Sequence, residues 1–164
     1  MHGFESALVL TTLLCSLVAG FLFAFAVVVM PGIRRLKDKD FVRAFQVMDG
    51  VIQNNQPIFL LVWMGSFVAL IVAAIVGVSQ LAGGWRWLLV ATALAYVLGV
   101  QWPTFAINIP LNKQLHAVDV EASNDTSVSA ARASFEPRWN RWNLVRTLVS
   151  TLVAVLLMVV LAGR

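Results

Sequence analysis

The amino-acid sequence predicts an all-α fold: an antiparallel four-helix bundle in a membrane, with a short amphipathic interfacial helix after the first span. Composition is one reason, since 60% of the 164 residues are hydrophobic and only 12% are charged, whereas soluble domains average about 25% charged residues. The length of the apolar runs is the other, because a spanning helix needs about 20 mostly apolar residues. Four runs reach that length, and together they predict a single transmembrane domain over residues 1–164. The runs cover residues 6–30, 58–78, 85–107 and 144–162.

The first apolar run is expected to be a retained span rather than a cleaved signal peptide. Its leader, Met1–Glu5, contains no Lys or Arg, and the run is longer than the roughly 7–15 residues of a signal core. At its end stands Met30-Pro31-Gly32. The proline ring and the glycine are expected to stop the helix there.

Residues 40–53 are expected to form the interfacial helix. Phe41, Phe45, Met48 and Ile52 recur at the spacing of one helical face. A helix with a single apolar face lies along a membrane surface, with that face toward the lipid. The segment is therefore predicted to rest on the membrane rather than to cross it.

Basic residues predict the orientation of the bundle. Of the twelve Lys and Arg residues, ten lie after the first span or between positions 113 and 146, and only Arg86 and Arg164 lie on the other side. Because Lys and Arg concentrate on the cytoplasmic side, both termini are expected outside a plasma (inner) membrane. Residues 108–139 then form a long cytoplasmic loop, whose end, Ala130–Glu136, is expected to be helical because Arg132 and Glu136 lie one turn apart. The same loops account for the pI of about 10.0, and nucleic-acid binding is not expected.

Small residues at regular spacing predict close contacts between helices. The second run carries Gly65, Ala69, Ala73 and Gly77, four residues apart, and the first and third runs carry similar stripes. Helices in lipid associate over such residues because their backbones can approach closely. The stripes are equally compatible with packing inside one bundle and with a homo-oligomer.

Polar residues gather at the predicted cytoplasmic ends of the spans. Amide side chains lead into the second span, end the third and open the fourth, so they are expected to converge on one polar pocket. Amides and an arginine among indole rings suit a flat, partly apolar ligand that carries oxygen atoms. The candidate pocket residues are Asn55, Trp102, Thr104, Asn108, Asn112, Trp139, Trp142, Asn143 and Arg146.

Each of these residues also has a purely structural interpretation. Tryptophans near a membrane surface commonly anchor a helix there, and Arg146 could extend its side chain to the lipid headgroups. Asn108 and Asn112 flank Pro110, where amides could bind carbonyl groups that the proline releases. Anchoring alone does not explain why all the groups converge, so a ligand site is the preferred interpretation.

A metal or haem site is an alternative that would use His2 or His116. The two histidines fall at opposite ends of the predicted bundle, and only Glu5 accompanies His2. Protein metal sites usually need three or four ligands, so the sequence predicts no metal or haem cofactor. Glu136 is the one carboxylate expected beside the pocket, either as a salt-bridging residue or as a general base.

Three segments of the chain resemble the anthrone oxygenase-like family, which comprises small four-helix membrane proteins, mostly of unassigned function. The resemblance covers nearly the whole chain and keeps the order of the motifs. The segments are FAFAVVVMPG at residues 23–32, PTFAINIPLN at residues 103–112 and WNRWNLVRT at residues 139–147.

The resemblance implies oxidation of an anthrone to an anthraquinone by molecular oxygen, without flavin or haem. A base would remove the acidic methylene proton, and the protein would stabilise the resulting oxyanion with hydrogen-bond donors. The base stays unassigned, since His116 or Glu136 would have to reach into the pocket. In this interpretation Asn108, Asn112 and Asn143 donate to the oxyanion, Arg146 stabilises its charge, and Trp139 or Trp142 stacks on the rings.

Two classes of function stay open beside the metal- or haem-dependent alternative. The first is a membrane-embedded oxidoreductase that acts on a lipophilic aromatic or quinol-like substrate. The second is a non-enzymatic membrane protein: a small-molecule binder, a transporter or an accessory subunit of a larger complex. The expected partners are the lipid bilayer, a lipophilic small molecule and, if the small-residue stripes pair between chains, a second copy of the protein.

Overall fold

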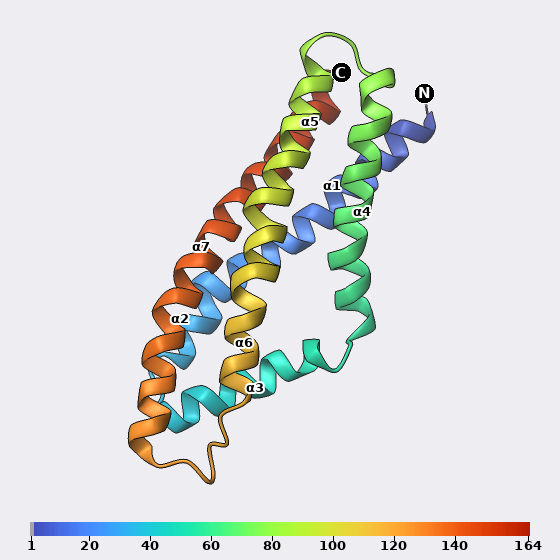
Figure 1. Ribbon diagram of the computed structural model, residues 1–164. Coiled ribbons are helices and arrows are strands. Elements are labelled where there is room, and N and C mark those ends of the chain that lie inside the picture. Colours follow the sequence, from blue (N-terminus) through green and yellow to red (C-terminus); the bar gives the residue numbers. More distant parts are fainter. Residues whose placement is uncertain (1) are drawn as a thin grey trace.

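The computed structural model describes residues 2–164, with the side chains of residues 3–164, and every regular element in this part of the chain is helical. Four long helical columns alternate in direction, and a fifth helix crosses one end of the bundle (Figure 1). The predicted fold class is confirmed. The columns are α1 (His2–Ala24) with η1 (Phe25–Val29) and α2 (Met30–Ile33); α4 (Pro57–Gln80); α5 (Gly84–Tyr96) with η2 (Val97–Gln101), η3 (Thr104–Asn108) and α6 (Ile109–His116); and α7 (Asp125–Gly163), while α3 (Asp38–Gln53) is the crossing helix.

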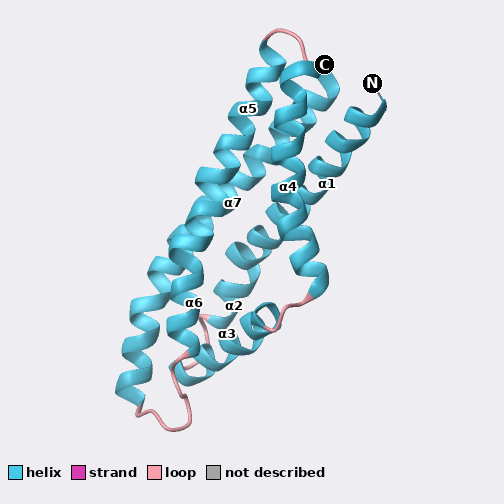
Figure 2. Cartoon of the chain, turned by 45° about the vertical axis from the view of Figure 1, so that its right-hand side comes forward, coloured by secondary structure: helices cyan, strands magenta, loops and turns pink. Residues whose placement is uncertain are grey.

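Each column contains a helix that is long and apolar enough to cross a membrane. Both termini and the α4–α5 connection lie at one end of the bundle, which we call the termini end (Figure 1). At the opposite end, the loop end, α3 and the α6–α7 connection lie together, and a second view shows the same arrangement (Figure 2). The apolar spans and this arrangement are those of an integral membrane protein.

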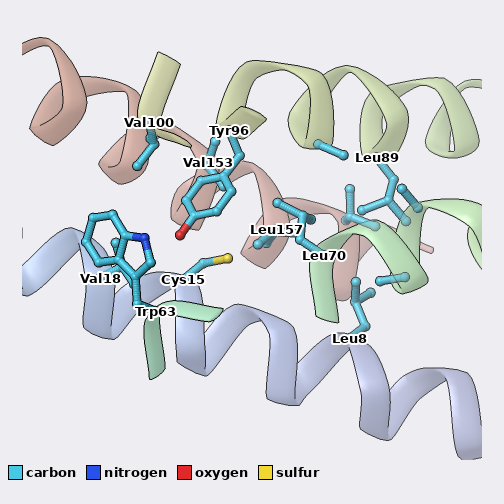
Figure 3. Close-up of a cluster of buried hydrophobic side chains, with 14 of the residues drawn as sticks. Leu8, Cys15, Val18, Trp63, Leu70, Leu89, Tyr96, Val100, Val153 and Leu157 are labelled. Atoms are coloured by element: carbon cyan, nitrogen blue, oxygen red, sulfur yellow. The ribbon is translucent and has the colours of Figure 1, made fainter. Parts of the chain in front are cut away.

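The half of the bundle near the termini end is an apolar core. Leu8, Leu70, Leu89 and Leu157 come from four different helices and are fully buried. Figure 3 shows these side chains in one cluster with Cys15 and Tyr96. The hydroxyl groups of Thr12 and Thr92 in this half donate to backbone carbonyls one turn earlier, and the hydroxyl oxygens of Tyr96 and Ser66 lie 2.7 Å apart. This half of the molecule holds the columns together.

A second apolar cluster fixes α3 against the loop end. Phe41 and Phe45 of α3 are buried against Phe135 and Trp139 of α7. The guanidinium group of Arg132 donates to the carbonyl oxygens of residues 34 and 36 and to the carboxylate of Asp38. It also lies 4.3 Å from the Phe41 ring centroid. Because α3 has a buried face, it is part of the bundle and not only a surface helix.

Three short π-helical segments carry the columns through prolines. In each of them, the residue directly before a proline donates its N–H to the carbonyl five residues earlier. A proline ring clashes with the carbonyl four residues back, and the wider turn moves that carbonyl aside. The donors Met30, Trp102 and Ile109 precede Pro31, Pro103 and Pro110, and their acceptors are the carbonyl oxygens of Phe25, Val97 and Thr104.

The structure tests two expectations about the ends of the helices. The first column ends at Ile33, one residue after the predicted stop at Met30-Pro31-Gly32. The third column continues past Pro110 to His116, beyond its predicted end, and α7 begins as early as Asp125. Most of residues 108–139 is therefore helical, and only residues 117–124 form a non-helical connection.

Small residues do bring helices close together, but not along every predicted stripe. A Cβ atom added at Gly77 would lie 2.6 Å from Cδ2 of Leu89, and one at Gly99 would lie 2.7 Å from Cγ1 of Val149. At Gly20 nothing would lie within 4 Å. The stripes of the second and third spans therefore include contacts inside the bundle, while Gly20 of the first is exposed.

Candidate functional site

A cavity of about 270 Å³ lies in the loop half of the bundle, bounded by α1–η1, α3, α4, η3–α6 and α7. Most of its wall is apolar and aromatic. Small-molecule sites commonly have such walls with a few convergent polar groups, and here those groups come from every bounding helix except α1–η1 and α4. Aromatic side chains in the wall are Phe21, Phe25, Phe45, Phe59, Trp63, Phe105 and Trp139, and the polar ones are Asp49, Gln53, Asn55, Thr104, Asn108, Asn112, Asn143 and Arg146.

Arg146 is the most unusual polar group in this wall. Its side chain is buried, with the residue only 4% exposed, and no described carboxylate lies within ion-pair distance of it. Nη1 donates to the hydroxyl of Thr104 at 3.0 Å and Nη2 to Oδ1 of Asn143 at 3.0 Å. Nε finds no acceptor among the described residues. A buried, unpaired cation is costly, so this guanidinium is suited to an anionic ligand atom.

Two asparagines of the cavity wall differ in their bonding. Asn143 is used structurally, because its Nδ2 donates to the carbonyl of Leu22 and its Oδ1 accepts from Arg146. Asn108 is 2% exposed, yet neither its Oδ1 nor its Nδ2 has a partner in the described part of the protein. A buried amide without partners costs free energy. Asn108 is therefore free to bind a ligand as both donor and acceptor.

A hydrogen-bonded chain runs through the cavity wall from α7 to α3. The indole N–H of Trp139 donates to Oδ1 of Asn112 at 2.8 Å, and Nδ2 of Asn112 donates to Oδ1 of Asp49 at 2.8 Å. Oδ2 of Asp49 accepts from Nε2 of Gln53 at 3.1 Å and lies 2.9 Å from Nε2 of His116. This last contact is close but is not aligned as a hydrogen bond.

Asp49 is the carboxylate that faces the cavity, and it is not among the candidates predicted from the sequence. Glu136, the carboxylate that the sequence predicts beside the pocket, is not in the cavity wall. It pairs with Arg132 at 2.9 Å and with Arg34 at 3.5 Å. A sequence signal for Asp49 did exist. It follows Phe45 by four residues, which places it on the apolar face of α3, where a carboxylate is unexpected.

The structure brings together most of the candidate residues but not all. Trp102 and Trp142 pack against each other, with ring centroids 6.3 Å apart, and neither is in the cavity wall. Trp139 is in the wall, and its ring lies 5.8 Å from the Arg146 guanidinium carbon. Asn55 is also in the wall; its left-handed backbone (φ 58°) turns the chain from α3 into α4, a conformation that Asn tolerates better than most residues.

The candidate metal ligands are not brought together. The side chain of His2 lies outside the described residues. Glu5 is bound to Arg164 at 3.1 Å at the termini end, and His116 contacts Asp49 at the loop end. No group of three or more His, Cys, Asp or Glu side chains within the described part of the chain is arranged to hold a metal ion.

Comparison with known proteins gives one match. A family model described as anthrone oxygenase matches residues 58–156, a range that includes α4, the third column and most of α7. Neither a curated protein nor a solved structure matches the chain. The matched range supplies Thr104, Asn108, Asn112, Asn143 and Arg146 to the cavity wall, whereas Asp49 precedes it. The match covers more than half of the chain, and the chain therefore belongs to the anthrone oxygenase family.

Proposed function

We propose that the protein is a membrane-embedded oxidoreductase that oxidises a lipophilic aromatic substrate of the anthrone or quinol type with molecular oxygen. The observation that carries this proposal is the buried guanidinium of Arg146 in the wall of a largely apolar cavity, without a carboxylate partner among the described residues. Such a group would strongly stabilise a substrate oxyanion, because little water competes with it there.

The proposed chemistry starts with removal of a proton from the methylene carbon of an anthrone. The electron pair of the broken C–H bond is delocalised onto the substrate oxygen, which becomes an oxyanion beside Arg146 and Asn108. The carbanion carbon then reacts with molecular oxygen, and protonation gives a hydroperoxide. Loss of one water molecule leaves a quinone carbonyl. The sum is anthrone plus O₂ giving anthraquinone plus H₂O, so oxygen is the only oxidant and accepts four electrons.

The aromatic part of the cavity wall suits the binding of the flat substrate. Aromatic side chains such as Phe25, Phe45 and Trp139 would hold a flat tricycle by offset or edge contacts. In the proposal no cofactor takes part, since the electron-rich carbanion itself reacts with oxygen. We further propose that the loop end faces the cytoplasm of a plasma membrane, as the distribution of basic residues predicts.

The proposal is tested by measuring the turnover of a variant that lacks the positive charge of Arg146. The purified protein in lipid nanodiscs is given an anthrone in air, and anthraquinone formation is followed by absorbance against a protein-free control. Arg146→Gln removes the charge and keeps an amide donor, and it should lower the rate above background by about 100-fold or more. Arg141→Gln removes an exposed charge from the same helix and should keep the wild-type rate.

Two results would count against the oxidoreductase. Wild-type protein that does not exceed the protein-free rate would contradict it, as would an Arg146→Gln variant with full turnover. Tight binding of anthrone or anthraquinone without turnover would instead support the alternative of a non-enzymatic binder or transporter. Each variant is first checked for a single monodisperse peak on gel filtration, so that misfolding is not taken for loss of chemistry.

A further inference from the structure

We infer that Asp49 is the catalytic base and that His116 passes the abstracted proton from it to the aqueous surface at the loop end. The inference rests on the proposed function, because it names the base that this reaction requires. It assigns a base that lies outside the family match, since Asp49 precedes the matched residues.

The position of Asp49 is that of a base rather than of a surface carboxylate. It lines the cavity and is only 6% exposed. The amides of Asn112 and Gln53 each donate to it, at 2.8 and 3.1 Å. These two bonds, one to each carboxylate oxygen, fix the direction of the group. Asn112 is in turn held by the indole N–H of Trp139, so the base is connected to the aromatic wall of the cavity.

His116 connects this carboxylate to a second depression on the outside of the loop end. Its Nε2 lies 2.9 Å from Oδ2 of Asp49, and the same residue lines a surface groove with Arg43, Gln46 and Glu121. The side chain of His116 is 30% exposed, whereas that of Asp49 is 7% exposed. Asp49 and His116 thus join a largely apolar cavity to a polar groove.

The backbone around the pair is fixed by a separate contact. Nε2 of Gln46 donates to the carbonyl oxygens of Leu115 and Val118, both at 2.9 Å. Gln46 therefore bonds α3 to the end of α6, on either side of His116. In the groove, Arg43 and Glu121 form their own ion pair at 2.6 Å. Asp119, which also lines the groove, accepts from the backbone N–H groups of residues 121 and 122, and His116 is the groove residue that contacts Asp49. An imidazole ring can both accept and release a proton, which is the property that a proton relay needs.

Each proton transfer breaks one bond and forms another. The C–H bond of the substrate breaks, an O–H bond forms at Asp49, and the electron pair stays on the substrate as the oxyanion beside Arg146. The O–H bond of Asp49 then breaks as Nε2 of His116 accepts the proton. Nδ1 of His116 releases a proton to water in the groove. Asp49 returns to its ionised form, and one proton has left the cavity.

An anaerobic exchange experiment tests the base separately from the oxygenation. Wild-type protein in nanodiscs is incubated with anthrone in D₂O under nitrogen, and exchange of the methylene protons for deuterium is measured by mass spectrometry. Wild-type protein should accelerate exchange over the protein-free rate. Asp49→Asn keeps the shape of the side chain and should reduce this acceleration by about 100-fold or more, with anthraquinone binding retained.

His116→Gln and Lys113→Gln form the second comparison. His116→Gln should slow exchange by about 10-fold, because a proton held on Asp49 returns to the substrate before it can reach the solvent. Added imidazole should restore the rate, since the groove is open to small molecules. Lys113→Gln removes an exposed charge from the same helix and should have the wild-type rate. A His116→Gln variant with unchanged exchange, or one that imidazole does not rescue, would overturn the role of His116.

The combined results distinguish the two proposals. Exchange that depends on Asp49, without oxidation in air, would uphold the base and contradict the oxygenase. Oxidation and exchange that both survive Asp49→Asn would uphold the oxygenase and overturn the base. Wild-type protein that accelerates neither reaction would overturn both.

Discussion

The polar residues of the cavity wall differ in whether their side chains bond within the described part of the protein or lack a partner there. Asn143 and Thr104 bond to Arg146 and hold it in place, whereas Asn108 is buried with both amide atoms free among the described residues. An arrangement that is costly for stability is expected where a site is prepared for a ligand. A substitution at Asn108 is therefore expected to change the stability of the protein and its activity in opposite directions.

Replacement of Asn108 by Leu is expected to raise stability and lower activity. Removing a buried amide that lacks partners recovers about 1–3 kcal/mol of desolvation free energy, which should raise the melting temperature in detergent. The loss of a donor to the oxyanion should reduce anthrone oxidation by at least about 10-fold.

The matched variant at the neighbouring asparagine should behave differently. Asn143→Leu removes the acceptor of Arg146 and the donor to the carbonyl of Leu22, so both melting temperature and activity should fall. If Asn108→Leu lowered the melting temperature as much as Asn143→Leu, Asn108 would be a structural residue and not a prepared ligand contact.

At the scale of elements, the π-helical segments determine which residues of the third column face the cavity. Thr104 and Asn108 are the first and last residues of η3, and both are in the cavity wall. A π turn inserts one extra residue and so rotates the next part of the column relative to a continuous α-helix. Prolines at the ends of η2 and η3 thus have a role in presenting the polar wall, which agrees with the frequent occurrence of π turns at functional sites.

Removal of the proline after η3 is expected to disturb the site more than the fold. Pro110→Ala supplies an N–H and removes the ring, which allows the helix to return to an α-helical register. Activity should fall by at least about 10-fold while the melting temperature stays equal or rises, measured by anthrone turnover and thermal denaturation. Pro137→Ala, also inside a helix but without an adjoining π segment, serves as the control and should keep activity.

A second prediction at the scale of elements concerns the close contact between the third column and α7 at Gly99. Gly99→Ala would place Cβ 2.7 Å from Val149 and should destabilise the contact between the third column and α7 by about 1–3 kcal/mol. Gly20→Ala meets nothing within 4 Å and should be neutral or slightly stabilising, because alanine favours a helix. Thermal denaturation of both variants in the same detergent measures the difference; equal melting temperatures would contradict the packing described for Gly99.

At the scale of the whole molecule, the bundle could be predicted from the sequence better than the site. Apolar length alone identifies the four spans, since lipid leaves few alternatives to helices. The predicted end of the third column was wrong because a π turn lets a helix continue through a proline and has no clear sequence signature. Asp49 was missed because α3 was expected to be a surface helix, and only the folded chain shows that its face at Phe45 and Asp49 is covered.

Membrane orientation is a property of the whole molecule that labelling can test. Ser129 is exposed near the start of α7 at the loop end, and Gln80 is exposed at the end of α4 at the termini end. In intact cells, Ser129→Cys should be protected from an impermeant thiol reagent and Gln80→Cys should react. The native Cys15 is buried and contributes little background. The reverse labelling pattern would place the loop end outside.

The measurement that tests the central claim most directly is the ionisation of a bound phenol in the cavity. A hydroxyanthraquinone changes colour when its phenol ionises, so a pH titration of the complex reports its pKa. If the buried charge of Arg146 stabilises a ligand oxyanion, wild-type protein and Arg141→Gln should lower this pKa by about one to three units relative to the free dye, and Arg146→Gln should not. The same bound pKa in wild-type protein and Arg146→Gln would contradict this role of Arg146.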